Sequence, residues 1–279
     1  MNIKKLIKRT LGLQKNVDNA SEVQIIFDTQ GDYAESIYSQ QFLEQHNPKL
    51  SRFFDEVVQK IEDGFGGWAL SKSCLRFLLG SMDPARITDH QYCVVELGGG
   101  QSTLFWKEIC NKFHGVTVIT WEHNQQFIEI LNGKVTGSSI CVENRKLQQY
   151  TDEDWDKIFS CCCLKDLDSA LISSRPLDLP MREYCNTRVH NVFYDISNIC
   201  IPTGKIDLLV VDGPHGNGRS LAFAALAKYM KQETLIVIDD VSHYPFLEML
   251  SKFINFKILY TSFSLNKQWI IVRVDSIIN

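Results

Sequence analysis

From residue 92 onward the chain alternates short apolar runs of strand length with stretches of helical periodicity. The apolar runs are Tyr92 to Leu97, Val116 to Trp121, Ser139 to Val142, Ile206 to Val211 and Leu235 to Ile238. Helical patterns fill the intervals, as in Ser102 to Phe113 and Arg219 to Met230. Strands that alternate with helices predict a doubly wound, Rossmann-like α/β sheet, whose ligands bind at the carboxyl ends of the strands. Two further strands, Lys257 to Thr261 and Gln268 to Val274, predict a closing antiparallel pair.

The region before this sheet predicts helices, because the apolar residues from Tyr33 to Leu79 recur at helical intervals. We therefore expect an N-terminal helical extension over residues 1–85 and an α/β domain over residues 86–279. The segment 148–191 has no clear periodicity and contains the run Cys161-Cys162-Cys163. We expect it to be an insertion or a lid that faces the substrate.

Residues 1–13 place apolar side chains at helical spacing among lysines and arginines, which predicts a short basic amphipathic helix. This helix either docks on its own domain or rests on an anionic membrane surface or a partner. Residues 16–32 are mostly polar and predict a linker.

Composition excludes several classes of protein. The formal net charge of -4 does not provide the basic field of a nonspecific nucleic-acid-binding protein, so a nucleic-acid substrate is not expected. The nine cysteines form no CxxC pair, so a zinc site or redox motif is not expected and reduced thiols in a cytoplasm are the simplest interpretation. No apolar stretch approaches the roughly 20 residues of a membrane-spanning helix.

A glycine-rich turn, Glu96-Leu97-Gly98-Gly99-Gly100, ends the first strand of the alternating pattern and leads directly into a helix. Glycines there allow positive φ and let a ligand approach the backbone closely. The dinucleotide pattern G-x-G-x-x-G would require a small residue where Thr103 stands. The carboxylate of Glu96 would repel a pyrophosphate but attract a cationic ammonium or sulfonium ligand. Charge therefore favours S-adenosylmethionine over NAD.

A second acid, Glu122, ends the next strand about twenty residues beyond the glycines, where a carboxylate can accept hydrogen bonds from both ribose hydroxyls. Helix capping by Glu96 and Glu122 is the alternative. Two acids at successive strand ends around a glycine turn favour a cofactor site.

These motifs resemble the class I S-adenosylmethionine-dependent methyltransferases over about Tyr92 to Asn279. In that family the acid-x-Gly-x-Gly motif holds the methionine part of the cofactor, and the acid after the second strand holds the ribose. The resemblance implies that adenine contacts come from within Cys141 to Lys146. The residues expected to bind the cofactor are Glu96, Gly98, Gly100, Ser102, Glu122 and Asp212.

Further acids follow the fourth and fifth strands: Asp212 in the phrase Val211-Asp212-Gly213-Pro214-His215, and the pair Asp239-Asp240. Both strand ends face one crevice in a doubly wound sheet, so these carboxylates should converge. A divalent cation, hydrogen bonds or a cationic substrate must offset their repulsion.

This trio resembles the magnesium site of the sugar O-methyltransferases of antibiotic biosynthesis and of the broader catechol-type group. The resemblance implies that Asp212, Asp239 and Asp240 hold Mg²⁺, which would clamp a substrate hydroxyl and lower its pKa. The chain departs from the sugar enzymes at Pro214, where they carry a second acid that acts as base.

Two histidines lie where they could replace that base. His215 and His243 can each take a proton from a hydroxyl near neutral pH, so both join Asp212 as candidate catalytic residues. Alternatively, Asp-Gly-Pro is simply a turn and the histidines lie on the surface. Arg219 either binds an anionic substrate group or is a solvated helix arginine.

The leading hypothesis is a methyltransferase acting on a hydroxyl of a small molecule or sugar, because VDGPHGNGR and IDD also resemble bacterial methyltransferases of surface polysaccharide synthesis. An aminopropyl transferase or NAD-dependent oxidoreductase of the same fold is the first alternative. A non-catalytic binding module is the second, although a scaffold has no need for clustered carboxylates.

Overall fold

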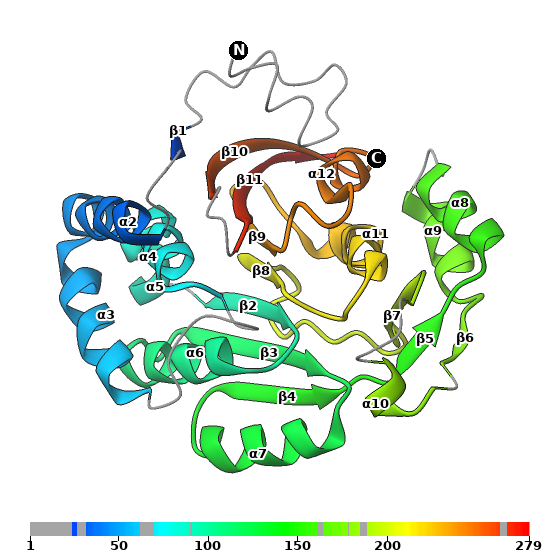
Figure 1. Cartoon of the computed structure of the whole chain (residues 1–279), viewed down its shortest axis with the longest axis horizontal. Helices are drawn as coiled ribbons and strands as arrows, with labels where there is room; N and C mark the ends of the chain where they lie inside the picture. The colour runs from blue at the N-terminus through cyan, green and yellow to red at the C-terminus, as the bar shows by residue number, and fades with distance from the viewer. Residues whose placement is uncertain are drawn as a thin grey trace.

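The computed structural model describes residues 24–26, 32–61, 70–89, 91–160, 164–177, 179–184, 189–262 and 267–278. Within these residues a twisted eight-stranded sheet forms the centre of the molecule (Figure 1). In spatial order its strands are β1 (Gln24–Ile26), β10 (Ile254–Ser262), β11 (Trp269–Ile277), β9 (Leu235–Asp239), β8 (Leu208–Val211), β2 (Tyr92–Leu97), β3 (Val116–Glu122) and β4 (Ile140–Asn144). The strands β4, β3, β2, β8 and β9 run parallel, and β11 pairs antiparallel with both β9 and β10.

This topology confirms the predicted fold class, an α/β methyltransferase-type sheet with a closing antiparallel pair. The chain builds β2, β3 and β4 toward one edge and then returns to place β8 on the other side of β2. The order of the strands therefore reverses between β2 and β8, and this switch point is where open α/β sheets bind their ligands. Both strands are buried along their whole length, which agrees with their apolar sequences, interrupted in β2 by Glu96.

Helices cover one face of the sheet and share a hydrophobic core with it. They are α2 (Asp32–His46), α3 (Pro48–Lys60), α4 (Lys72–Ser81), α5 (Pro84–Asp89) and α6 (Gln101–Lys112), with α7 (Gln125–Val135) beside α6 and against β4. Apolar side chains from α3, α4 and α6, such as Phe54, Phe77 and Phe105, are almost completely buried there. The helices predicted before the sheet are thus present and cover its surface.

The opposite face carries α11 (Leu221–Leu226), α12 (Phe246–Leu250) and the segment between β4 and β8 (Figure 1). The helix predicted over Arg219 to Met230 is shorter than expected, because 3-10 turns at Asn217–Ser220 and Ala227–Tyr229 flank α11. The helix predicted over Tyr244 to Phe253 is likewise limited to α12.

The segment predicted over 148–191 folds into regular elements despite its weak periodicity. It contains α8 (Asp152–Ser160), α9 (Leu164–Leu171) and α10 (Met181–Tyr184), together with a three-stranded sheet. The strands are β6 (Arg175–Pro176), β5 (Leu147–Gln149) and β7 (Val192–Tyr194), in that spatial order. Because β5 and β7 pair antiparallel, both ends of the segment meet beside the main sheet. Side chains of α8 and α9 enter the core of this face, so the segment is an integral part of the fold.

The predicted linker over 16–32 is partly wrong, because Gln24–Ile26 forms β1 and pairs in parallel with β10. The predicted amphipathic helix of residues 1–13 and the run Cys161-Cys162-Cys163 lie outside the described residues. Among the residues that are described, no helix combines the length and the hydropathy needed to cross a membrane.

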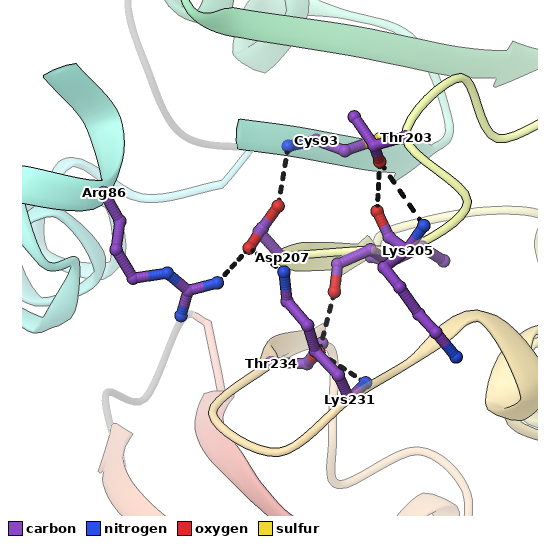
Figure 2. A network of polar contacts seen from close by, with 8 residues as sticks. Arg86, Cys93, Thr203, Lys205, Asp207, Lys231 and Thr234 are labelled. Atoms are coloured by element: carbon purple, nitrogen blue, oxygen red, sulfur yellow. Dashed lines mark hydrogen bonds and ion pairs between the residues drawn. The ribbon is translucent and has the colours of Figure 1, made fainter. Parts of the chain in front are cut away.

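A polar network fastens the amino-terminal end of β8, opposite the ligand-binding end (Figure 2). Asp207, which is almost fully buried, accepts a hydrogen bond from the Cys93 backbone N–H at 3.0 Å and pairs with Arg86 and with Lys231, whose Nζ lies 2.8 Å away. Arg86 belongs to α5, Cys93 to β2, and Lys231 to the turn before β9. One carboxylate thus joins a helix, a central strand and a turn.

We predict that Asp207→Ala lowers the free energy of unfolding by about 2–3 kcal/mol, because it leaves the buried Cys93 N–H unpaired and removes the partner of two cations. Urea denaturation measures this change. Asp168→Ala, which breaks the exposed pair with Lys228, is the control and should change stability by less than about 1 kcal/mol. Equal effects of the two substitutions would contradict the assigned role of Asp207.

Candidate functional site

Two turns touch at the switch point of the sheet, one after β2 and one after β8. Gly98 has a φ of +94°, and a Cβ at this position would lie 3.0 Å from the Gly213 backbone nitrogen. A Cβ on Gly213 would lie 2.9 Å from the Gly98 Cα. Neither position can accept a side chain without displacing the other turn, so glycine is required at both. This contact defines the floor of the candidate site.

Glu122, at the end of β3, binds the glycine turn directly. Its Oε2 accepts a hydrogen bond from the Gly99 N–H at 3.0 Å, and its Oε1 accepts from the backbone N–H groups of His123 and Asn124 at 2.8 and 2.7 Å. Burial raises the pKa of Glu122, but the hydrogen bonds and the neighbouring His123 outweigh burial and lower the pKa overall. The glycine turn is therefore hydrogen-bonded to the ionised carboxylate of Glu122.

Glu96 supports the same turn from inside the protein. It is fully buried, and its Oε2 accepts hydrogen bonds from the hydroxyls of Thr103 at 2.6 Å and Thr120 at 2.9 Å. The Thr103 hydroxyl oxygen in turn accepts from the Gly100 N–H at 3.0 Å. Burial raises the pKa of Glu96, although hydrogen bonds from residues that include Thr103 and Ser102 oppose this rise. Glu96 thus acts on the turn through Thr103.

The other residues of the glycine motif lie as the sequence indicates. Gly100 precedes α6 with an extended backbone, and no atom of the described chain lies within 4 Å of the position of its missing Cβ. Ser102 is buried in the first turn of α6. The direct cofactor contacts of Glu96, Gly98, Gly100 and Ser102 stay predictions.

The carboxylates after β8 and β9 converge as predicted. Ligand oxygens of Asp212, Asp239 and Asp240 all lie within 4.8 Å of one another. Burial, and then repulsion from Asp239, raise the pKa of Asp212 well above its ordinary value. Burial also raises the pKa of Asp239, although the Lys267 ammonium, 2.7 Å from Asp239 Oδ2, opposes the rise. A ligand that brings positive charge to this cluster would relieve the repulsion.

Arg219 ties together the two loops that carry these acids. It is buried, its Nε donates to the Pro214 carbonyl at 2.8 Å, and its Nη1 donates to the Asp239 carbonyl at 3.3 Å. Nη1 also lies 3.5 Å from Asp240 Oδ2. The interpretation of Arg219 as a solvated helix residue is therefore wrong, because its guanidinium fixes the loops around the acidic cluster.

His215 and His243 are both exposed beside this cluster. The His243 N–H donates to the Asp240 carbonyl at 3.0 Å. Partial burial lowers the pKa of His215, and the positive charge of Arg219 lowers it further, while Asp240 opposes them. His215 is thus neutral at physiological pH and able to accept a proton.

Sequence reasoning missed three residues of this site. Lys267 precedes β11, and Tyr194 ends β7 of the small sheet. His123 packs edge-on against Tyr184, with ring centroids 5.2 Å apart. No local pattern marks Tyr194 or Lys267, because both reach the site through tertiary pairing of distant segments. His123 directly follows Glu122 in the sequence, and that position is the signal by which it could have been found.

Comparison with known protein families shows the family to which the chain belongs. A family model described as a methyltransferase domain matches residues 95–241, more than half of the chain. The chain belongs to the methyltransferase domain family. The match begins inside β2 and ends just after Asp240, so it includes the glycine turn, Glu122 and the acidic cluster. Membership implies S-adenosylmethionine-dependent methyl transfer.

Solved structures are similar at low sequence identity. A precorrin-6y C5,15-methyltransferase from Geobacter metallireducens is 14% identical, with a TM-score of 0.42 over 77% of this chain and 96% of that one. A TehB-like SAM-dependent methyltransferase from Corynebacterium glutamicum is 12% identical, with a TM-score of 0.37 over 68% of this chain and 83% of that one. A spermidine synthase from Thermotoga maritima is 10% identical, with a TM-score of 0.36 over 70% of this chain and 57% of that one. No curated protein matches the chain in sequence.

We predict that Glu122→Gln lowers the free energy of unfolding at pH 7 by about 2–3 kcal/mol. Both carboxylate oxygens of Glu122 accept backbone N–H groups, whereas glutamine has one acceptor oxygen and no charge, so at least one N–H loses its acceptor and the remaining hydrogen bonds are weaker. The folded-state pKa of Glu122 lies below its ordinary value, so the advantage of the wild type is fully present above the unfolded-state pKa of about 4.3 and is lost as pH falls through the folded-state pKa. Denaturation from pH 7 to pH 3 measures this.

The exposed Glu129, on α7, provides the control. Glu129→Gln should change stability by less than about 0.5 kcal/mol at every pH. If the difference in free energy of unfolding between wild type and Glu122→Gln increased as the pH was lowered, this result would contradict the ionised state of Glu122.

Proposed function

We propose that this methyltransferase transfers the methyl group to a hydroxyl of a small molecule or sugar, with Mg²⁺ held by Asp212, Asp239 and Asp240. The observation that carries the proposal is the convergence of three carboxylates within 4.8 Å at the ends of β8 and β9, beside the glycine turn. Sugars of bacterial surface polysaccharides are the acceptors that the sequence resemblance favours.

The cluster suits a hard cation because it offers oxygen ligands alone, the type that Mg²⁺ prefers. Burial and repulsion raise the pKa of Asp212, and burial raises the pKa of Asp239, so a bound cation would favour the ionised form of both carboxylates. Lys267 and Arg219 neutralise only part of the cluster's negative charge. When bound, S-adenosylmethionine supplies an electrophilic methyl group, and Mg²⁺ lowers the pKa of the acceptor hydroxyl.

The chain's own residues divide the remaining work. Gly98 and Gly100 allow close approach of the cofactor to the backbone, and Glu122 accepts hydrogen bonds from its ribose. The side chain of His215, exposed beside Asp240, takes the proton of the acceptor hydroxyl. Methyl transfer then requires little of the protein beyond this positioning and deprotonation.

We predict that Mg²⁺ binds the purified protein and that Asp240→Asn weakens this binding at least about tenfold, because one anionic ligand is lost. Asparagine suits the test because Asp240 has a φ of +52°, which asparagine also tolerates. Calorimetric titration of MgCl₂ measures the affinity, and Asp168→Asn, at an exposed position of helix α9, is the control. Transfer of tritiated methyl to a panel of sugars and phenols should stop with EDTA and resume with Mg²⁺. Full activity in EDTA would contradict the metal.

His215 provides a separate prediction. His215→Gln should lower kcat about 100-fold with little change in the affinity for S-adenosylmethionine, because the proton acceptor is lost while the cofactor site remains. Wild-type kcat should fall as pH drops through the lowered pKa of His215, and this limb should disappear in the variant. His243→Gln, which removes the neighbouring exposed imidazole, is the comparison and should retain most activity. A larger loss in His243→Gln would assign the base to His243.

A further inference from the structure

The hydroxyl of Tyr194 is a buried polar group that the fold does not use. Tyr194 ends β7 and is fully buried, and its Oη has no hydrogen-bond partner among the described residues. The other tyrosines of this region differ, since the hydroxyl of Tyr150 donates to the Leu171 carbonyl and that of Tyr184 to the His215 carbonyl, both at 3.0 Å. A buried hydroxyl without a partner destabilises the folded state relative to phenylalanine. Its presence therefore needs a functional explanation.

This hydroxyl reaches the contact between the two glycine turns. A Cβ placed on Gly213 would lie 2.7 Å from Tyr194 Oη and 2.9 Å from the Gly98 Cα. The Tyr194 ring is held edge-on against Trp121, with centroids 6.0 Å apart, and lies 6.0 Å from the ring of His123. The small inserted sheet thus delivers one polar atom to the floor of the cofactor site.

The surroundings of Tyr194 Oη are acidic. Burial raises the pKa of Tyr194 well above its ordinary value, and Glu122, Tyr184 and Asp212 raise it further, while the positive charge of Arg219 opposes them. The group is therefore a neutral phenol whose oxygen lone pairs remain available. A cationic ligand is the complement of a site that combines ionised Glu122, acidic Asp212 and a hydroxyl oxygen.

We propose that Tyr194 Oη lies against the sulfonium of S-adenosylmethionine. It would accept weak hydrogen bonds from the positively polarised C–H groups bound to the sulfur. The position suits this part of the cofactor, because Glu122 is the expected ribose ligand and Asp212 lies beside the acceptor, and the sulfonium joins these two regions. Contacts of C–H groups with oxygen are weak when neutral and strengthen when the carbon is bound to a charged centre. The inference rests on S-adenosylmethionine binding and is independent of the metal and of the acceptor.

This role predicts discrimination between the cofactor and its product. S-Adenosylhomocysteine has the same ribose, adenine and amino-acid groups but is a neutral thioether without the methyl group. Tyr194 would therefore favour the methyl donor over the spent product, whereas Glu122 contacts groups that both molecules share.

The test is calorimetric titration of S-adenosylmethionine and, separately, S-adenosylhomocysteine into wild type and Tyr194→Phe. We expect the Kd of S-adenosylmethionine to rise about fivefold in the variant, the upper range for loss of a C–H contact with oxygen. The Kd of S-adenosylhomocysteine should change less than about twofold. The melting temperature of the ligand-free variant should equal or exceed that of wild type, because an unpartnered hydroxyl is removed.

Tyr150→Phe is the matched control, because it removes a partnered hydroxyl from the same inserted segment. It should lower the melting temperature and leave both affinities unchanged. Equal weakening of both ligands in Tyr194→Phe, or no change in either, would overturn the assignment of Tyr194. A wild-type protein that bound neither ligand would instead overturn cofactor binding itself, so the two failures are distinguishable.

Discussion

The backbone contact between Gly98 and Gly213 is the constraint on which the site depends. Each glycine occupies a position where a Cβ would collide with the other turn, so the loops after β2 and β8 can approach only because neither carries a side chain there. The contact lies at the reversal of strand order, where parallel strand ends leave a crevice. The residues around it, from Glu122 on one side to Asp212 on the other, receive their relative positions from it.

The acids around this contact have different electrostatic environments; Glu96, Glu122 and Asp239 are buried, and Asp212 is partly buried. Glu122 accepts backbone N–H groups and remains ionised, while Glu96 lies deeper and stabilises the turn through Thr103. Asp212 and Asp239 repel each other, and Lys267 offsets this repulsion only in part. The crevice therefore carries a negative potential at its centre, which suits a sulfonium cofactor and, in our proposal, a metal ion.

The sequence predicted those features that depend on local pattern. The strands, the glycine turn and the acids at the strand ends are all local signals, and the doubly wound topology follows from their alternation. The secondary structure of the segment over 148–191 could not be predicted, because its short helices and strands are stabilised by pairing with distant residues. Gln149, for example, pairs with Val192 in the register of β5 and β7. The positions of Tyr194 and Lys267 in the site could not be predicted for the same reason. The loop-fixing role of Arg219 also required the fold, since its partners lie up to twenty-one residues away in sequence.

Two aspartates at opposite ends of β8 illustrate how function can be separated from stability. Asp207 and Asp212 flank the same buried strand, five positions apart. The first is surrounded by two cations and a backbone N–H, the arrangement that allows a buried carboxylate to stabilise a fold. The second faces another carboxylate, which raises its pKa. This repulsion opposes the ionised form of Asp212 and does not itself stabilise the fold. The repulsion becomes useful only when a positively charged ligand enters, because binding then releases it. The amino-terminal end of β8 thus contributes to folding, and the carboxyl end stores unfavourable electrostatic energy that favours binding of a cation.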